Sequence, residues 1–396
     1  MKILIVHNDY GKYSGEEAVV DKMAMMLEAS GHHVAQLRMS SAKVIGSTIG
    51  KIHGFVAGIH SPSGILAMKK ALEKEKPDIV NIHNLYPFIS PAALRVCKKE
   101  RVPVVMTVHN FRLICPTGLF MRDNKPCELC LRKGNEWGCV KYNCENSLAK
   151  SIGYAVRNAV ARINRYYIDN VDCFACITDF QRQKLIEAGF PAEKITVIPN
   201  SADTAVEACT NDGDYVAYSG RISREKGVDL IIEAARRNPD IPFRLAGAVR
   251  DTGLISDLPE NVEHVGYLSG QKLHDFYANA RFFVMASRWY EGFPMTILET
   301  ARFRKPMIAP DHGGFSEIIG HGIDAIGMLT IPGDISTLSG SIRNLWDNPS
   351  QSRLFGDKAH RKLVNCYSDT IVSSMWNNLL YQLIQIKSFA YQANDI

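Results

Sequence analysis

Residues 282–303 read FFVMASRWYEGFPMTILETARF, and they contain the strand-to-helix junction on which the fold assignment depends. The apolar run 282–285 predicts a buried strand, whereas the spacing of apolar residues over 295–303 predicts an amphipathic helix. Pro294 suits the first turn of that helix, because its missing N–H group would have no partner there. A buried strand that passes through a short polar loop into a helix is the repeating unit of a parallel α/β sheet.

The same alternation of short β-rich runs and helical stretches extends over the rest of the chain. It begins with a strand at 3–6 and restarts with a new buried strand at 215–219. We therefore predict an α/β fold with two Rossmann-like, doubly wound domains that face a central cleft. The expected parts are a first domain at 1–200, a second domain at 214–370, and a C-terminal helix at 371–396 that packs back toward the first domain.

The composition is that of a globular protein. The 396 residues are 46% hydrophobic and 22% charged, which excludes a disordered or fibrous chain. No run approaches the roughly 18 apolar residues of a membrane-spanning helix, and the first apolar run is too short for the core of a signal peptide, so we expect a cytoplasmic protein.

The net charge of +5 is divided unequally along the chain. Residues 1–200 hold 27 basic and 18 acidic residues, whereas the remainder holds 19 basic and 23 acidic residues. This asymmetry suggests that the first half meets an anionic partner such as a lipid headgroup surface, a phosphorylated acceptor or nucleic acid. Uneven solubilising charge explains it equally well.

The loop between the strand at 282–285 and its helix carries two glutamates eight residues apart, Glu291 and Glu299. Gly292 allows close approach of the backbone, and the start of the helix offers unpaired N–H groups to a phosphate. Glu291 in the loop and Glu299 within the helix are placed to accept hydrogen bonds from sugar hydroxyls. Two surface carboxylates on an ordinary helix would be the simpler interpretation, but it does not explain the Glu-Gly-Phe-Pro turn.

Basic residues follow the strand at 215–219. Arg221 and Lys226 flank a turn where two cations can hold a diphosphate, although basic loop residues alone are usually just solvated. The first turn of the chain carries Ser14 and Gly15 ahead of a helix, which makes it a candidate phosphate-facing loop. It lacks the Gly-x-Gly-x-x-Gly spacing of an ordinary nicotinamide site.

Together these residues resemble the family 4 retaining glycosyltransferases with a GT-B fold, of the type that builds bacterial surface polysaccharides. The most specific element is the Glu291…Glu299 pair, which matches the family's E-x7-E motif. The resemblance implies that Glu291 meets the donor sugar and Glu299 the ribose. It also implies that Arg221 and Lys226 bind the diphosphate and stabilise it in the transition state.

Further roles come from the resemblance alone. It implies that His109 lies near the transferred sugar, that Tyr267 lies near the nucleobase, and that the backbone of Gly292, Phe293 and Pro294 meets the sugar and phosphate. Two positions depart from the family pattern, because Asn110 stands where Asp is common and Ser14-Gly15 stands where many members have Gly-Gly.

The resemblance implies a retaining transfer of a sugar from a nucleotide-sugar donor to a glycan acceptor in O-antigen, capsule or exopolysaccharide biosynthesis. The acceptor would be linked to polyprenyl diphosphate, which would bring the enzyme to the inner face of the cell membrane. Catalysis would need no metal cofactor, and no nucleic acid is expected as a partner. The alternatives are a GT-B nucleotide-sugar epimerase, a zinc-stabilised nucleic-acid-binding protein and an inactive sugar-binding protein.

Five cysteines gather in an insertion at about 112–146. The spacing Cys127-x2-Cys130 and Cys139-x4-Cys144 has the shape of a structural zinc loop, and Cys115 could replace one ligand. Free cysteines in an irregular loop are an equally good interpretation. So many cysteines indicate a closed site rather than a catalytic one.

A helix is expected at 147–168, where basic residues lie among apolar ones. A basic amphipathic helix of this kind can lie on an anionic bilayer, although a packed helix with a solvated face is the commoner case. The basic residues concerned are Lys150, Arg157, Arg162 and Arg165.

Overall fold

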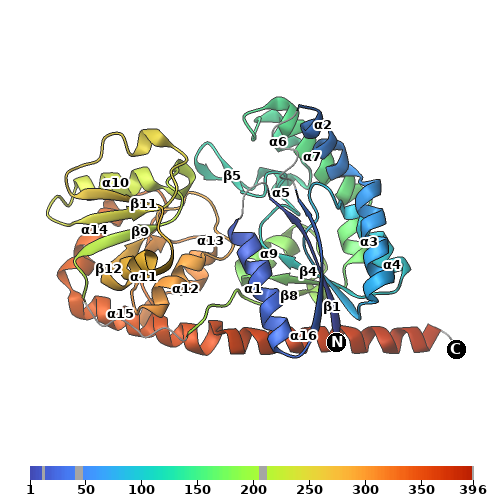
Figure 1. Cartoon of the computed structure of the whole chain (residues 1–396). Helices are drawn as coiled ribbons and strands as arrows, with labels where there is room; N and C mark the ends of the chain where they lie inside the picture. The colour runs from blue at the N-terminus through green and yellow to red at the C-terminus, as the bar shows by residue number, and fades with distance from the viewer. Residues whose placement is uncertain (11–13, 41–47, 205–211, 395–396) are drawn as a thin grey trace. The chain divides into compact units, whose positions relative to one another are not determined.

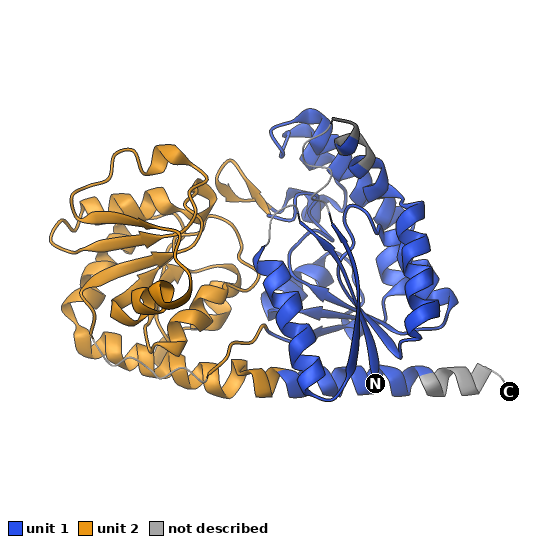
Figure 2. Cartoon of the chain, viewed as in Figure 1, with its two compact units in different colours: residues 1–119, 128–199, 373–396 blue, residues 120–127, 200–372 orange. Residues whose placement is uncertain are grey.

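The computed structural model describes residues 1–10, 14–40, 48–204 and 212–394. It divides into two compact units (Figure 2). Unit 1 comprises residues 1–119, 128–199 and 373–396, and unit 2 comprises residues 120–127 and 200–372. None of the helices within the described residues is long and apolar enough to cross a membrane.

Unit 1 is built on a parallel sheet whose described strands follow the order β2-β1-β3-β4-β7-β8 (Figure 1). The central strand β1 buries six consecutive residues, Ile3 to Asn8, because helices cover both faces of a parallel sheet. The strands are β1 (Lys2–Asp9), β2 (His33–Ser40), β3 (Ile79–Asn84), β4 (Val104–Val108), β7 (Cys173–Cys176) and β8 (Ile195–Val197).

Helices flank this sheet, with α1 on one side and α3 and α4 on the other (Figure 1). Helix α1 begins with a capping box, in which Ser14 Oγ accepts from the Glu17 N–H and the Glu17 carboxylate accepts from the Ser14 N–H. The helices of unit 1 are α1 (Gly15–Ala29), α2 (Thr48–Ile59), α3 (Pro62–Glu75), α4 (Leu94–Lys99), α5 (Leu129–Lys133), α6 (Trp137–Lys141), α7 (Leu148–Ile163), α8 (Tyr166–Asn170) and α9 (Asp179–Glu187).

Unit 2 contains a second parallel sheet, whose described strands follow the order β11-β10-β9-β12-β13-β14. The order reverses between β9 and β12, and ligands of open α/β sheets bind at such a switch point, beyond the carboxyl ends of the strands. The strands are β9 (Tyr215–Ser219), β10 (Phe243–Ala246), β11 (Val262–Gly266), β12 (Ala280–Val284), β13 (Met307–Pro310) and β14 (Met328–Thr330).

A short hairpin and a set of helices complete unit 2. The hairpin joins β5 (Met121–Arg122) to β6 (Lys125–Pro126). The helices are α10 (Val228–Arg236), α11 (Gly270–Asn279), α12 (Met295–Arg302), α13 (Gly313–Ile319), α14 (Ile335–Asp347) and α15 (Pro349–Lys362). The fold is thus two Rossmann-like α/β domains, as predicted.

The last helix, α16 (Asp369–Asn394), begins in unit 2, and from Ser373 onward it counts with unit 1. Two side-chain contacts tie this part of α16 to the end of α1 and the turn after it. Ser373 Oγ lies 2.8 Å from Ser30 Oγ, and Asn377 Oδ1 lies 2.8 Å from His32 Nε2.

One helix prediction was wrong in detail, and one helix was not predicted. The helix expected at 147–168 is interrupted, since α7 ends at Ile163 and Arg165 adopts the left-handed conformation with φ 50° before α8 begins. Helix α2 was not predicted, because the three glycines within it, Gly50, Gly54 and Gly58, lower its helix propensity.

Candidate active site

The carboxylate of Glu291 is the centre of a hydrogen-bonded cluster in unit 2. Its Oε1 atom accepts from Lys226 Nζ at 2.6 Å, from Trp289 Nε1 at 2.7 Å and from Ser287 Oγ at 2.8 Å. Burial alone would raise the pKa of Glu291, but Lys226 and the other two donors hold it below its ordinary value. Glu291 is therefore ionised at neutral pH, and these three bonds use only one of its two oxygens.

The two basic residues lie beside one aromatic ring. The Arg221 guanidinium carbon is 5.8 Å from the centre of a Trp289 ring, and Lys226 Nζ is 5.3 Å from it. These are cation–π distances, so the indole helps to hold two cations near each other. This role of Trp289 could not be predicted from the sequence, because an aromatic residue in a loop belongs to no periodic pattern.

Hydrogen bonds join the loop after β12 to the loop after β9 and to the start of α10. Arg288 pairs in bidentate fashion with Asp229 at 2.5 and 2.7 Å, and its N–H donates to the Glu225 carbonyl at 2.9 Å. Gly227 stands between these loops with φ +69°, and a Cβ there would lie 1.9 Å from the Ala286 carbonyl oxygen. Only glycine fits this position, which sets the relative placement of Lys226 and Glu291.

Glu299 lies within α12 and accepts a hydrogen bond from Tyr277 Oη at 2.6 Å. Burial raises the pKa of Glu299, while Tyr277 and the charge of Arg302 act in the opposite direction. The structure thus places Glu291 and Glu299 in different environments. Glu291 is stabilised as an anion, whereas Glu299 is a buried carboxylate with one neutral donor.

The remaining predicted donor residues differ in how firmly they are held. Phe293 is buried, and Pro294 is the N-cap of α12. The turn that contains Gly292 packs on the start of α13, where a Cβ on Gly314 would lie 2.6 Å from the Gly292 carbonyl oxygen. Tyr267 follows β11 with 76% of its surface exposed, so its ring is open to a planar ligand.

In unit 1, His109 follows β4 and forms a buried pair with His83 at the end of β3. His83 Nδ1 lies 2.7 Å from His109 Nε2. Burial lowers the pKa of His109 to about 4 and the pKa of His83 well below its usual value. Both imidazoles are therefore neutral at physiological pH.

The pairing constrains the tautomers of these two rings. His83 Nε2 is buried without a hydrogen-bond partner, and an orphaned lone pair is less costly than an orphaned N–H group. This assigns the proton of His83 to Nδ1, which donates to His109 Nε2. His109 then carries its own proton on Nδ1, where it can serve as a neutral donor to a hydroxyl group.

The residue after this histidine has its own partners. Asn110 Oδ1 accepts from the Arg112 N–H at 2.9 Å, and Asn110 Nδ2 donates to Glu16 Oε2 at 3.3 Å. Neither contact involves His109. Gly15 is exposed at the start of α1, and a Cβ there would meet nothing within 4 Å, so none of the described residues of unit 1 requires glycine at this position.

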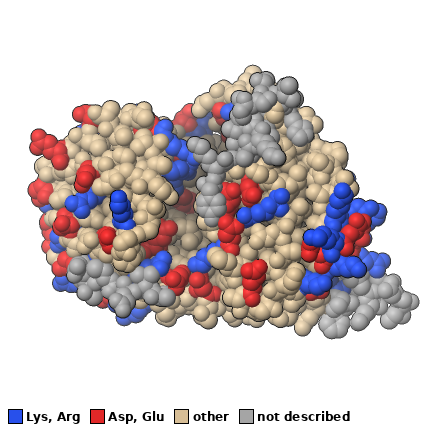
Figure 3. All heavy atoms as spheres, in the orientation of Figure 1, with Lys and Arg blue, Asp and Glu red and all other residues tan. Residues whose placement is uncertain are grey.

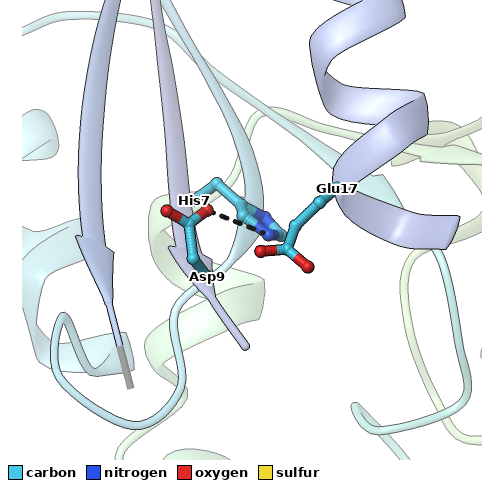
Figure 4. A group of neighbouring side chains, drawn as sticks. All are labelled: His7, Asp9 and Glu17. Carbon is cyan, nitrogen blue, oxygen red and sulfur yellow. Dashed lines mark ion pairs between the residues drawn. The ribbon is translucent and has the colours of Figure 1, made fainter. Parts of the chain in front are cut away.

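A third buried histidine, His7 in β1, points toward Asp9 and Glu17 (Figure 4). Their potential metal-ligand atoms lie within 4.8 Å of one another, and within the described residues no other such group has this spacing. Both carboxylates have other partners, however. Asp9 Oδ1 lies 3.7 Å from Arg38 Nε, and Glu17 Oε2 accepts from the Ser14 N–H at 2.7 Å.

A buried thiol, that of Cys139, lies within the cysteine segment. Cys139 is 1% exposed, and the thiols that act on it are those of Cys144, Cys115 and Cys130. A hydrogen bond with Cys144, burial and the charges of these neighbours raise the pKa of Cys139.

Two Rossmann-like units, one with basic and acidic side chains at its switch point, define a two-domain α/β protein with the GT-B fold. Two sequence profiles match the chain. The profile described as Glycosyltransferase Family 4 matches residues 13–206, and the one described as Glycosyl transferases group 1 matches residues 201–362. The chain belongs to the family 4 type of GT-B glycosyltransferases.

Solved structures have the same fold. HepE from Anabaena, crystallised in complex with UDP, matches with a TM-score of 0.68 and 17% identity, over 96% of this chain and 100% of that one. Sucrose-phosphate synthase from Thermosynechococcus elongatus matches with a TM-score of 0.70 and 16% identity, over 97% and 99%.

Curated relatives match the chain with higher sequence identity than these two structures do. An exopolysaccharide phosphotransferase of Streptomyces coelicolor is 28% identical over 231 residues, which is 54% of this chain and 24% of that protein. An uncharacterized 42.6 kDa protein of the Klebsiella pneumoniae cps region is 28% identical over 61% of this chain and 60% of its own length. The O-antigen chain mannosyltransferase C of Escherichia coli is 22% identical over 98% of this chain and 100% of its own. The chain thus spans less than two thirds of the first two relatives.

Proposed function

We propose that this protein transfers a sugar from a nucleotide-sugar donor to a glycan acceptor in the biosynthesis of a bacterial surface polysaccharide. The observation that carries the proposal is the Glu291 carboxylate, which is held ionised by Lys226, Trp289 and Ser287 at the switch point of unit 2. The match to the glycosyltransferase profiles and the UDP bound by HepE support a nucleoside-diphosphate donor.

The roles follow from the charges. Arg221 and Lys226 bind the diphosphate, and their charges stabilise the negative charge that develops on it as the sugar leaves. Glu291 accepts hydrogen bonds from donor hydroxyls through its second oxygen, and Glu299 binds the ribose diol. Transfer proceeds with retention, and the leaving diphosphate oxygen takes the acceptor's proton on the same face. Catalysis then depends mainly on positioning and charge rather than on a protein nucleophile.

The test is a thermal-shift and turnover screen of the full chain with a panel of nucleotide sugars. A donor that binds the folded chain raises its melting temperature, and Glu299→Ala should reduce that shift. Lys226→Ala should lower turnover strongly, because it removes charge stabilisation from the transition state. Lys272→Ala, an exposed lysine on α11, is the matched control.

The outcomes separate the competing activities. Transfer to a glycan acceptor with the donor's anomeric configuration supports the proposal, whereas donor consumption without acceptor would indicate an epimerase. Normal turnover in Lys226→Ala would overturn the assignment of the diphosphate site. Binding to random nucleic acid that falls steeply with salt would favour the nucleic-acid alternative.

The acceptor is proposed to be lipid-linked, and the surface of α7 supports a docking site for an anionic membrane. Leu148, Ile152 and Val156 repeat every four residues along one face of this helix, and each is at least 39% exposed. The exposed side chain of Lys150 lies on the same helix. An exposed apolar strip is the chemistry that enters the surface of a bilayer, whereas Lys150, two residues from both Leu148 and Ile152, lies on another face of the helix.

The basic residues expected to face the membrane are mostly engaged elsewhere. Arg157 is buried over the ring of Tyr86, and Arg162 pairs in bidentate fashion with Glu136 at 2.9 and 3.0 Å. On the face drawn in Figure 3, acidic and basic side chains are interspersed over both units. Docking therefore depends on the apolar strip of α7 rather than on a continuous basic surface.

A further inference from the structure

The end of β1 and the start of α1 bring three potential metal ligands together in unit 1 (Figure 4). His7 and Asp9 are two residues apart in β1, so their side chains lie on the same face of the strand. Glu17 lies in the first turn of α1 and points toward them. One potential ligand atom from each residue lies within 4.8 Å of the other two. The group therefore combines an imidazole nitrogen with two carboxylates.

The imidazole of His7 lacks the partners that a buried polar ring normally has. Its side chain is 0% exposed, yet neither Nδ1 nor Nε2 has a hydrogen-bond partner among the described residues. Most buried polar groups in proteins are hydrogen-bonded, because an unpaired one costs free energy. Burial lowers the pKa of His7 to about 4, so the ring is neutral at physiological pH. A neutral imidazole has one lone pair, and this is the form that binds metal ions.

The two carboxylates keep oxygen atoms for a further partner. Asp9 Oδ1 is buried without a hydrogen bond within the described residues, because its 3.7 Å separation from Arg38 Nε is too long for one. Arg38 pairs more closely with Asp21, at 2.6 Å. Glu17 accepts from the Ser14 N–H through Oε2, and its carboxylate has a second oxygen. The single charge of Arg38 therefore balances only one of these three carboxylates.

We infer that His7, Asp9 and Glu17 bind one Zn²⁺ ion. Zinc accepts imidazole and carboxylate ligands together, whereas magnesium and calcium prefer oxygen ligands alone. Three protein ligands leave a fourth position for water. Ligand atoms about 2.1 Å from a tetrahedral zinc ion lie roughly 3.4 Å apart, so the widest separation in this group has to shorten by at most about 1.4 Å.

The ion would join the end of β1 to the first turn of α1. Metal binding to a folded site stabilises the folded chain, so its role here is to stabilise the contact between this strand and this helix. The three ligands belong to unit 1, whereas the Glu291 cluster belongs to unit 2. The inference therefore does not depend on the proposed function, and it shares no residue with the cysteine segment.

The experiment measures the zinc bound to the purified full-length chain and to variants of nearly the same shape. After saturation with Zn²⁺ and removal of the free ion, Asp9→Asn and Glu17→Gln should each carry one Zn²⁺ fewer per molecule than the intact chain. Glutamine also serves in capping boxes, so Glu17→Gln keeps the start of α1. Glu28→Gln, at an exposed glutamate of the same helix, is the matched control and should carry as much zinc as the intact chain. Equal zinc content in all four proteins would overturn the inference, and zinc held by cysteines does not alter these differences.

Thermal unfolding of the same full-length chain gives a second measurement. In the presence of a chelator, His7→Phe should be at least as stable as the intact chain, because the His7 ring has no hydrogen bond to lose among the described residues. Added Zn²⁺ should then raise the melting temperature of the intact chain more than that of His7→Phe. Mg²⁺ at the same concentration should leave both unchanged, because it favours six oxygen ligands. A zinc-induced rise that is as large in His7→Phe as in the intact chain, or an equal rise with Mg²⁺, would contradict the inference.

Discussion

At the scale of single residues, the proposed donor site depends on the hydrogen bonds that one carboxylate oxygen accepts. Three donors converge on Glu291 Oε1, and one of them, Trp289, also lies against the cations Arg221 and Lys226. Hydrogen bonds to a charged group contribute about 1.5–3 kcal/mol each. Trp289 therefore links the carboxylate proposed to meet the sugar to the two cations proposed to bind the diphosphate.

Trp289→Phe removes the indole N–H and keeps an aromatic ring beside the two cations. We expect turnover with a nucleotide-sugar donor to fall roughly tenfold to hundredfold, which is the equivalent of one charge-assisted hydrogen bond. Steady-state kinetics of the full chain would measure it. The same exchange at Trp137, whose side chain is 73% exposed, should leave turnover unchanged. Equal rates for both variants would refute the role of Trp289.

At the scale of an element, glycine is required at the start of one helix but not at the start of another. Gly227 precedes α10 with φ +69° and no room for a Cβ, whereas Gly15 begins α1 in open space. Gly227→Ala should destabilise unit 2 by several kcal/mol, since about 1 kcal/mol of left-handed strain adds to a backbone clash. Urea unfolding would show the loss as a lower midpoint.

Gly15→Ala is the matched exchange at the other helix start. Alanine is the better helix former by up to about 1 kcal/mol, so the midpoint of unfolding should stay constant or rise. A fall in transfer rate with unchanged stability would show that a phosphate approaches this backbone closely. A large loss of stability at Gly15 would contradict the open environment that the structure assigns to it.

The sequence predicted most elements because their signals are local. The strand at 282–285 corresponds to β12, and the helix at 295–303 corresponds to α12, since an apolar run marks the strand and Pro294 marks the start of the helix. The break at Arg165 could not be predicted, because a non-glycine residue at φ 50° has no composition signal. The bond from Trp289 to Glu291, two residues apart in one loop, depends on the path of the loop backbone, which has no periodic signal in the sequence.

At the scale of the whole molecule, buried histidines link stability to pH. Burial lowers the pKa of His7 and of His109 from 6.5 to about 4, whereas an unfolded chain would titrate near 6.5. The unfolded state therefore binds more protons between these values, so stability is fully present above pH 6.5 and is lost as pH falls toward 4. At pH 5 the expected loss is about 2 kcal/mol for each histidine.

His7→Phe isolates one part of this effect. Neither ring nitrogen of His7 has a hydrogen-bond partner, so an apolar ring should be neutral or stabilising at pH 7.5. At pH 5 the variant should be more stable than the unaltered chain by about 2 kcal/mol more than at pH 7.5. Urea unfolding at both pH values measures this difference. A difference between the two chains that does not change with pH would contradict the neutral, buried state of His7.

Membrane docking is argued at the scale of the whole molecule, because the apolar strip of α7 would bring the entire chain to the bilayer surface. Ile152→Asp places a charge in the middle of the strip and should weaken binding to anionic vesicles at least tenfold, since one buried isoleucine contributes about 1.5–3 kcal/mol. Flotation of the full chain with vesicles that contain or lack anionic lipid would measure it. Ile323→Asp, at an isoleucine of unit 2 that is 85% exposed, is the matched control and should bind normally. If the fraction of protein that floats with the vesicles changes neither with anionic lipid nor with Ile152→Asp, α7 is not a docking surface for a membrane. The acceptor would then be sought among soluble glycans.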